Sequence, residues 1–186
     1  MSFGRTYREL FPLWKKALKP GAIEFFPVDE RKVPINHPES NWGMAVRLLL
    51  NLSADKTSLE NFVSSAEQYR ELLLRKLGAS SPIFDTVYLG IGDDGHTASL
   101  FPGQSYAPGE TVFETESPNH PFPRVTLSPT ILASARTVIF IVTDPHKKKI
   151  LRRVLSLEAG LPAAEVLKTA AKVKVIVPGN LLEKIE

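Results

Sequence analysis

The residues with the clearest potential for chemistry are Asp94 and His96, which stand two positions apart with Gly95 between them. In a turn, this spacing lets both side chains face one cavity. An imidazole titrates near neutral pH and can take a proton from water, while a carboxylate beside it can fix the tautomer and favour the imidazolium that forms. The pair therefore indicates general-base catalysis. The same residues also fit a structural role, in which Asp94 caps the following turn and His96 is a hydrogen-bonded loop residue.

The sequence around this pair has the succession of elements that is typical of a ligand-binding loop in an α/β protein: a strand, a glycine-containing loop and a helical turn. Residues 86–91 form a short apolar run of β-formers, typical of a strand that is covered on both faces. Gly92 and Gly95 then allow backbone conformations and close approaches that a side chain would block. Residues 97–101 favour a short helical turn. Because ligands in open α/β sheets bind beyond the carboxyl ends of the strands, the pair stands where chemistry is expected.

Other catalytic chemistries find less support in the sequence. A nucleophilic triad with Ser99 as the attacking group is a competing interpretation, but no G-x-S-x-G elbow surrounds that serine. The histidines are too scattered for a recognisable zinc spacing, and without cysteine a metal site would need carboxylates. The glycines spell neither G-x-G-x-x-G nor G-x-x-x-x-G-K-[ST], the dinucleotide and P-loop patterns. We therefore expect no metal and no cofactor.

Binding of a phosphate is the second chemistry that the sequence indicates. One candidate is a small polar loop at the start of a predicted helix, where backbone N–H groups and the helix dipole favour an anion: Ser2, Gly4, Arg5 and Thr6. The other candidates are three cations at or just after the ends of predicted strands: Arg31, Arg124 and Lys147. Each cation alone also fits a solvated surface charge. The basic run 147–153 is mostly typical of a solvated helix face, although a lysine in its first turn could reach a bound phosphate.

Length and composition are those of an ordinary globular protein. The 186 residues suit one domain with a substantial core, so we expect residues 1–186 to form a single domain. The formal charge of +3 accompanies no interleaving of aromatic and basic residues, which argues against nucleic acid as a partner. There is no cysteine, the N-terminus has no apolar signal core, and the longest apolar run, residues 138–142, is too short to span a bilayer. We expect a cytoplasmic monomer with no membrane partner.

Hydrophobic periodicity predicts alternating helices and strands. Helices are predicted over residues 5–19, 42–52, 57–77, 128–135, 145–157 and 162–170. Strands are predicted over residues 22–28, 86–91, 111–114, 124–127, 138–143 and 173–177. Thr57 or Ser58 would cap the longest helix, and Gly78 would end it. The alternation predicts an α/β fold with an open, mostly parallel sheet and helices on both faces.

The chain resembles the 6-phosphogluconolactonase family, within the superfamily that includes the glucosamine-6-phosphate isomerases/deaminases. Residues 89–103, LGIGDDGHTASLFPG, closely follow the family's signature. Three further stretches resemble its other signatures: residues 29–34 with Ser40-Asn41, residues 123–127, and Val142-Thr143 leading to Lys147. The deaminase branch follows the shared D-G-H core with a different sequence, so residues 97–102 favour the lactonase branch.

The resemblance implies hydrolysis of 6-phospho-D-glucono-1,5-lactone to 6-phospho-D-gluconate in the oxidative pentose phosphate pathway, without a metal. His96 would be the general base that activates water, and Asp94 would orient it. Backbone N–H groups of the loop that holds Gly92 and Gly95 would stabilise the oxyanion. The phosphate and the sugar hydroxyls would be shared among the candidates given above: Gly4, Arg5, Thr6, Arg31, Arg124 and Lys147.

Departures from the family pattern keep alternatives open. Family members usually have a strand, a helix and a further strand before the phosphate loop, and this chain begins at that loop. We therefore expect an N-terminally shortened fold with part of its sheet unpaired. Phe3 and Tyr7 stand where the family has glycine and proline, and the family's Asp near the last strand is replaced around residues 178–179. The alternatives are a non-catalytic sugar-phosphate-binding protein and an aminosugar-phosphate isomerase/deaminase.

Overall fold

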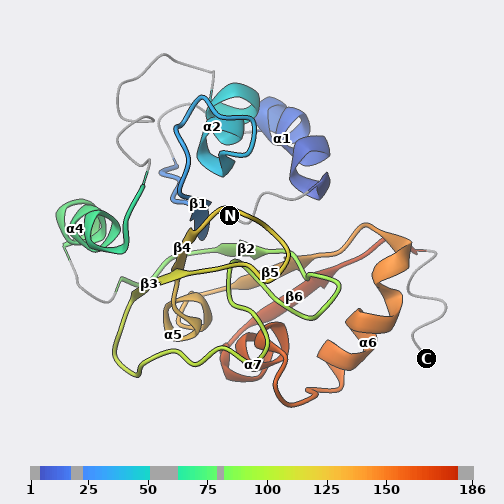
Figure 1. Cartoon of the computed structure of the whole chain (residues 1–186). Helices are drawn as coiled ribbons and strands as arrows, with labels where there is room; N and C mark the ends of the chain where they lie inside the picture. Colours follow the sequence, from blue (N-terminus) through green and yellow to red (C-terminus); the bar gives the residue numbers. More distant parts are fainter. Residues whose placement is uncertain (1–4, 18–22, 51–62, 79–81, 180–186) are drawn as a thin grey trace.

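Two three-stranded sheets form the framework of the described residues (Figure 1). The computed structural model describes residues 5–17, 23–50, 63–78 and 82–179. The parallel sheet has the strand order β2 (Val87–Leu89), β5 (Val138–Ile141), β6 (Val173–Ile176). The antiparallel sheet has the order β1 (Asp29–Arg31), β4 (Arg124–Leu127), β3 (Val112–Thr115).

The parallel sheet with helices on both faces confirms the predicted α/β class. In Figure 1 the helices on one side are α1 (Arg5–Ala17) and α2 (Asn41–Ala45), which continues as the π-helical turn η1 (Val46–Leu50). Those on the other side are α5 (Pro129–Ala133), α7 (Pro162–Thr169) and α6 (Lys148–Leu155), which follows the 3-10 turn η2 (Pro145–Lys147). A further helix, α4 (Ala66–Leu77), packs beside β3. Within the described ranges, no helix is long and apolar enough to cross a membrane.

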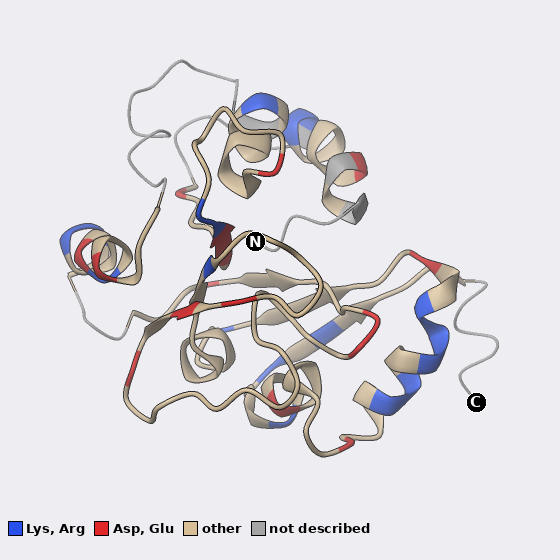
Figure 2. Ribbon diagram, in the orientation of Figure 1, with Lys and Arg blue, Asp and Glu red and all other residues tan. Residues whose placement is uncertain are grey.

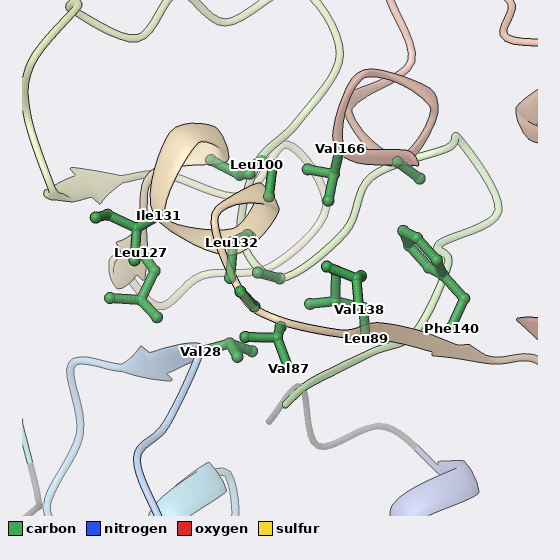
Figure 3. Close-up of a cluster of buried hydrophobic side chains, with 14 of the residues drawn as sticks. Val28, Val87, Leu89, Leu100, Leu127, Ile131, Leu132, Val138, Phe140 and Val166 are labelled. Atoms are coloured by element: carbon green, nitrogen blue, oxygen red, sulfur yellow. The ribbon is translucent and has the colours of Figure 1, made fainter. Parts of the chain in front are cut away.

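Side chains alternate between the two faces of the parallel strands, as the pleat of a strand requires. The larger core lies between β2, β5, α5 and α7 (Figure 3) and includes Val87, Leu89, Leu132, Val138, Phe140 and Val166. Tyr88, between the two inward residues of β2, packs on the opposite face against Trp14 of α1, with 4.8 Å between ring centroids. The same strand therefore holds helices on both faces.

The direction of the parallel strands decides where the predicted site lies. Leu89 of β2 pairs with Phe140 of β5, so the two strands end at the same edge of the sheet. Residues 90–96 and 142–147 follow these strands and meet there. This edge is the carboxyl edge, where open α/β sheets bind their ligands.

The strand predicted over residues 22–28 is wrong. Residues 23–28 belong to no described strand, and β1 starts only at Asp29. Pro27 has no N–H to give to a ladder, and residues 23–26 and 28 border an apolar cavity of about 470 Å³ together with residues 83–88 of the β2 region. The other predicted strands are confirmed with small shifts at their ends. The antiparallel sheet was not predicted, because β1 and β4 come from distant parts of the chain.

Two helical predictions are corrected by local backbone geometry. The longest helix starts at Ala66, because the extended Ser65 (φ −146°) accepts from the N–H of Gln68 and so caps it. Thr57 and Ser58 lie outside the described residues, and Gly78 ends the helix in a left-handed conformation, as predicted. Residues 97–101 form a tight turn in place of a helical one, with the N–H of residue 100 donating to the carbonyl of residue 97.

Glu30 of β1 ties the antiparallel sheet to α2. Its fully buried carboxylate accepts hydrogen bonds from the N–H groups of Asn41 (2.8 Å) and Trp42 (2.6 Å) and from the hydroxyl of Ser40 (3.1 Å). Burial raises the pKa of Glu30, and the hydrogen bonds from the backbone oppose that rise. The carboxylate therefore accepts hydrogen bonds from N–H groups at the start of α2 that have no acceptor within the helix.

Replacing Glu30 with alanine is expected to lower the free energy of unfolding by about 3 kcal/mol, because buried donors lose their acceptor. Urea denaturation measures this change. The matched control is Glu110→Ala, which removes an exposed ion pair with Arg70 (3.2 Å) and should cost at most about 1 kcal/mol. Equal losses in the two variants would contradict the capping role.

Candidate active site

Two cavities open at the carboxyl edge of the parallel sheet. The first, of about 530 Å³, lies between the start of α1, the loop after β2 and the loop after β5. The second, of about 330 Å³, lies between the loop after β2, the strands β1 and β4, and residues 117–120. His96 borders both cavities. A ligand in either cavity therefore meets the imidazole.

The structure brings the predicted pair together. The Nδ1 atom of His96 lies 2.6 Å from Oδ1 of Asp94, and the backbone N–H of His96 donates to the same oxygen at 3.1 Å. Partial burial acts to raise the pKa of Asp94, but the hydrogen bonds and the charge of His96 outweigh it, so the pKa lies below its ordinary value. The carboxylate is therefore ionised at neutral pH. It fixes Nδ1 as the donor and leaves Nε2 to accept a proton.

The glycines of this loop shape the site by leaving room. A Cβ atom at Gly92 would lie 2.0 Å from Nδ1 of His96, so only glycine allows the ring to sit there. Gly95 has a φ of +89°, which a side chain rarely adopts. The N–H groups of Gly92 and Gly95 donate to the carbonyls of His96 (2.8 Å) and Gly92 (3.0 Å). Both N–H groups have acceptors in this structure, so the role that the geometry shows for these glycines is steric, and an oxyanion contact from this loop stays a prediction.

The three predicted cations are divided between the cavities. Arg31 and Arg124 border the second cavity, and Lys147 borders the first. Arg31 donates to the carbonyl of Glu39 (2.8 Å) and to the side chain of Asn41 (2.9 Å). Lys147 donates from Nζ to the carbonyl of Ile91. The three cations therefore lie at two separate places, and which of them binds the phosphate and which the sugar hydroxyls stays a prediction.

Arg124 is the most buried of these cations, with 7% of its surface exposed. Burial lowers its pKa, and the carboxylate of Asp29, 3.8 Å from Nη1, acts in the opposite direction. Its Nε atom is buried with no hydrogen-bond partner among the described residues. The guanidinium thus lies at the wall of the second cavity with a buried donor that has no acceptor among the described residues.

Beyond Lys147, the predicted basic run is a surface of α6. Ile150, Leu151 and Val154 are buried, while Lys149, Arg152 and Arg153 are exposed on the outer side of the helix (Figure 2). This agrees with a solvated helix face. Of the predicted N-terminal loop, Ser2 and Gly4 lie outside the described residues, and Arg5 and Thr6 begin α1.

Asp29 is the main site residue that the sequence did not single out. It is 2% exposed and borders the second cavity. Its Oδ2 accepts from the hydroxyl of Ser99 at 2.7 Å, and its Oδ1 has no hydrogen-bond partner in the part of the chain that is described. This oxygen can accept a hydrogen bond from a hydroxyl group of a ligand. The sequence held one signal for it, because Asp29 begins the charged stretch Asp29-Glu30-Arg31.

The contact with Asp29 also corrects the interpretation of Ser99 as a nucleophile. Ser99 is fully buried, borders neither cavity, and donates to Asp29 and not to His96. A nucleophilic serine needs a base within hydrogen-bond reach and access to the substrate. Ser99 instead holds Asp29 at the wall of the second cavity.

Comparisons with known proteins identify the family of the chain. The model of the family described as glucosamine-6-phosphate isomerases/6-phosphogluconolactonase matches residues 1–176. A 6-phosphogluconolactonase of Homo sapiens is 38% identical over 151 residues, which make up 74% of this chain and 58% of that protein. A solved structure of 6-phosphogluconolactonase from Trypanosoma cruzi is 30% identical with a TM-score of 0.80, covering 98% of this chain and 82% of the other. A monomeric glucosamine-6-phosphate deaminase, 18% identical with a TM-score of 0.70 over 98% of this chain and 86% of its own, shares the fold.

Proposed function

The chain belongs to the family of glucosamine-6-phosphate isomerases and 6-phosphogluconolactonases, and we propose that it hydrolyses 6-phospho-D-glucono-1,5-lactone to 6-phospho-D-gluconate, a step of the oxidative pentose phosphate pathway. The observation that carries the proposal is the Asp94–His96 pair, because His96 borders two cavities that charged and polar side chains also line. The names of its relatives supply the substrate. The lactonase activity is favoured over deamination by residues 97–102 and by the 38% identity to a lactonase.

In the proposed reaction, His96 acts as the general base. Its Nε2 takes a proton from water while the water oxygen attacks the C1 carbonyl of the lactone. Asp94 holds the reactive tautomer and stabilises the imidazolium that forms. The tetrahedral intermediate then breaks the bond between C1 and the ring oxygen, and that oxygen takes a proton from the imidazolium. The product is the open-chain acid.

The remaining polar groups would bind the substrate. Arg31 and Arg124 in the second cavity and Lys147 in the first offer donors to phosphate and hydroxyl oxygens. The unpartnered Oδ1 of Asp29 would accept a hydrogen bond from one sugar hydroxyl. The contribution of Gly4, Arg5 and Thr6 to phosphate binding stays a prediction.

We further propose that residues 1–186 act as one domain, as a monomer and in the cytoplasm. Size-exclusion chromatography with light scattering tests the monomer, and microscopy of a tagged chain tests the location. A dimer mass or a membrane-associated signal would contradict these proposals.

Lactone made in situ from glucose 6-phosphate by its dehydrogenase provides the test of function. We expect the chain to hydrolyse this lactone well above the spontaneous rate. Folded protein that gives no acceleration would refute the lactonase proposal. Retained binding of 6-phosphogluconate would then favour the non-catalytic binding protein, and release of ammonia from glucosamine 6-phosphate would favour the deaminase.

A further inference from the structure

Phe101 contacts two groups to which the proposed reaction gives a role. Its ring centroid lies 5.1 Å from that of His96, with 50° between the ring planes. The guanidinium carbon of Arg124 lies 6.0 Å from the same Phe101 centroid. Phe101 is 3% exposed and borders the second cavity. One buried aromatic ring therefore lies against both the imidazole and a cation of the site.

A hydrogen-bonded network fixes Phe101 to the antiparallel sheet. The backbone N–H of Phe101 donates to the hydroxyl of Tyr106 at 2.9 Å, and this hydroxyl donates to Oε1 of Gln104 at 2.9 Å. The hydroxyl of Thr115, in β3, donates to the same oxygen at 2.7 Å. Gln104 also donates to the carbonyl of Glu116 at 3.0 Å. The backbone of Phe101 is thus tied to β3, a strand that carries none of the predicted site residues.

Phe101 adds an aromatic contact to the restraints that Asp94 and Gly92 place on His96. Asp94 holds Nδ1 through a hydrogen bond in the plane of the ring, and the missing side chain at Gly92 makes room for that position. The hydrogen bond to Asp94 alone leaves the ring free to tilt about the Nδ1–Asp94 direction, and the backbone of Gly92 lies beside the ring near Nδ1. An aromatic ring packed at 5.1 Å opposes this tilt, and its π face also favours the imidazolium that forms during proton transfer.

We propose that Phe101 is a positioning residue, which holds the His96 imidazole and the Arg124 guanidinium in a fixed relation across the second cavity. The expected effect on the rate rests on the proposed function, because the tilt of His96 sets the direction from which Nε2 takes a proton from water. The placement itself is a property of the free protein and can be measured without substrate.

The kinetic test compares three variants in the lactone assay. Phe101→Leu keeps an apolar side chain but removes the ring, and it should lower kcat about tenfold, since misplacement of reacting groups is costly. Phe101→Tyr keeps the ring, so its kcat should stay within about threefold of the wild type. Phe84→Leu is the matched control and should keep the wild-type kcat, because Phe84 packs on Phe26 at 5.7 Å between ring centroids and borders neither cavity of the site.

NMR of the His96 ring protons provides the substrate-free test. The ring current of Phe101 should shift these resonances in the wild type, and Phe101→Leu should remove the shift while Phe84→Leu preserves it. Unchanged His96 resonances in Phe101→Leu, or an equal loss of kcat in both leucine variants, would overturn the proposal. A wild type with no lactonase activity would refute the proposed function, while the NMR comparison would still decide the positioning.

Discussion

Replacing His96 with asparagine is expected to lower kcat for lactone hydrolysis by about 10²- to 10⁴-fold, the range that general-base catalysis contributes. Asparagine can still donate to Asp94, so the loop should keep its shape, but it cannot take a proton from water. The measurement is the initial rate of lactone hydrolysis, corrected for the spontaneous reaction, together with the melting temperature of each variant.

His37→Asn is the matched control for this experiment. His37 borders neither cavity, and its Nδ1 accepts from the N–H of Glu39 at 3.1 Å, a contact that asparagine can keep. Its kcat should stay within about threefold of the wild type, because it takes part in no proton transfer. A His96→Asn variant with wild-type kcat would refute His96 as the base even if the protein is a lactonase.

Replacing Gly92 with alanine is expected to lower kcat about 10²-fold, although the added group is a single methyl. The new Cβ would overlap the ring of His96, whose Nδ1 lies 2.0 Å from its position, so the imidazole must leave its contact with Asp94. Displacement of a reacting group by about 1 Å can reduce a rate to this extent. Steady-state kinetics measure the loss, and the His96 resonances should report the displaced ring.

Gly90→Ala separates this steric effect from a general intolerance of the loop. A Cβ atom at Gly90 meets nothing within 4 Å, so the ring of His96 should stay in place. We expect its kcat to exceed that of Gly92→Ala by at least about tenfold. Similar losses at the two positions would show that chain flexibility, and not contact with His96, explains the result.

The parts of the site that are local in the chain could be predicted from the sequence. Asp94 and His96 are two residues apart on a loop that follows a clear strand, so their hydrogen bond needs only a turn. The strands β4 and β5 are continuous β-forming runs and were found at nearly the correct bounds. The helix ended by Gly78 had a clear C-terminal signal.

The parts that depend on distant segments could not be predicted in this way. The contact between Asp29 and Ser99 joins residues 70 positions apart, and nothing in either local sequence indicates it. The division of Arg124 and Lys147 between two cavities follows from the antiparallel sheet, which hydrophobic periodicity does not reveal. The segment 23–28 has strand-forming residues but no place in a described strand, because strand formation needs a partner as well as propensity.

The pairing of β1 with β4 has a consequence for how the protein becomes active. Asp29 lies opposite Thr126, so forming this wall of the second cavity brings together the two ends of a chain segment that contains more than half of the residues. The entropy lost in closing such a loop must be overcome before the contact contributes, which slows folding. The Asp94–His96 turn closes only a few residues and can form early. Recovery of ligand binding after denaturation should therefore lag behind recovery of the local acid–imidazole contact.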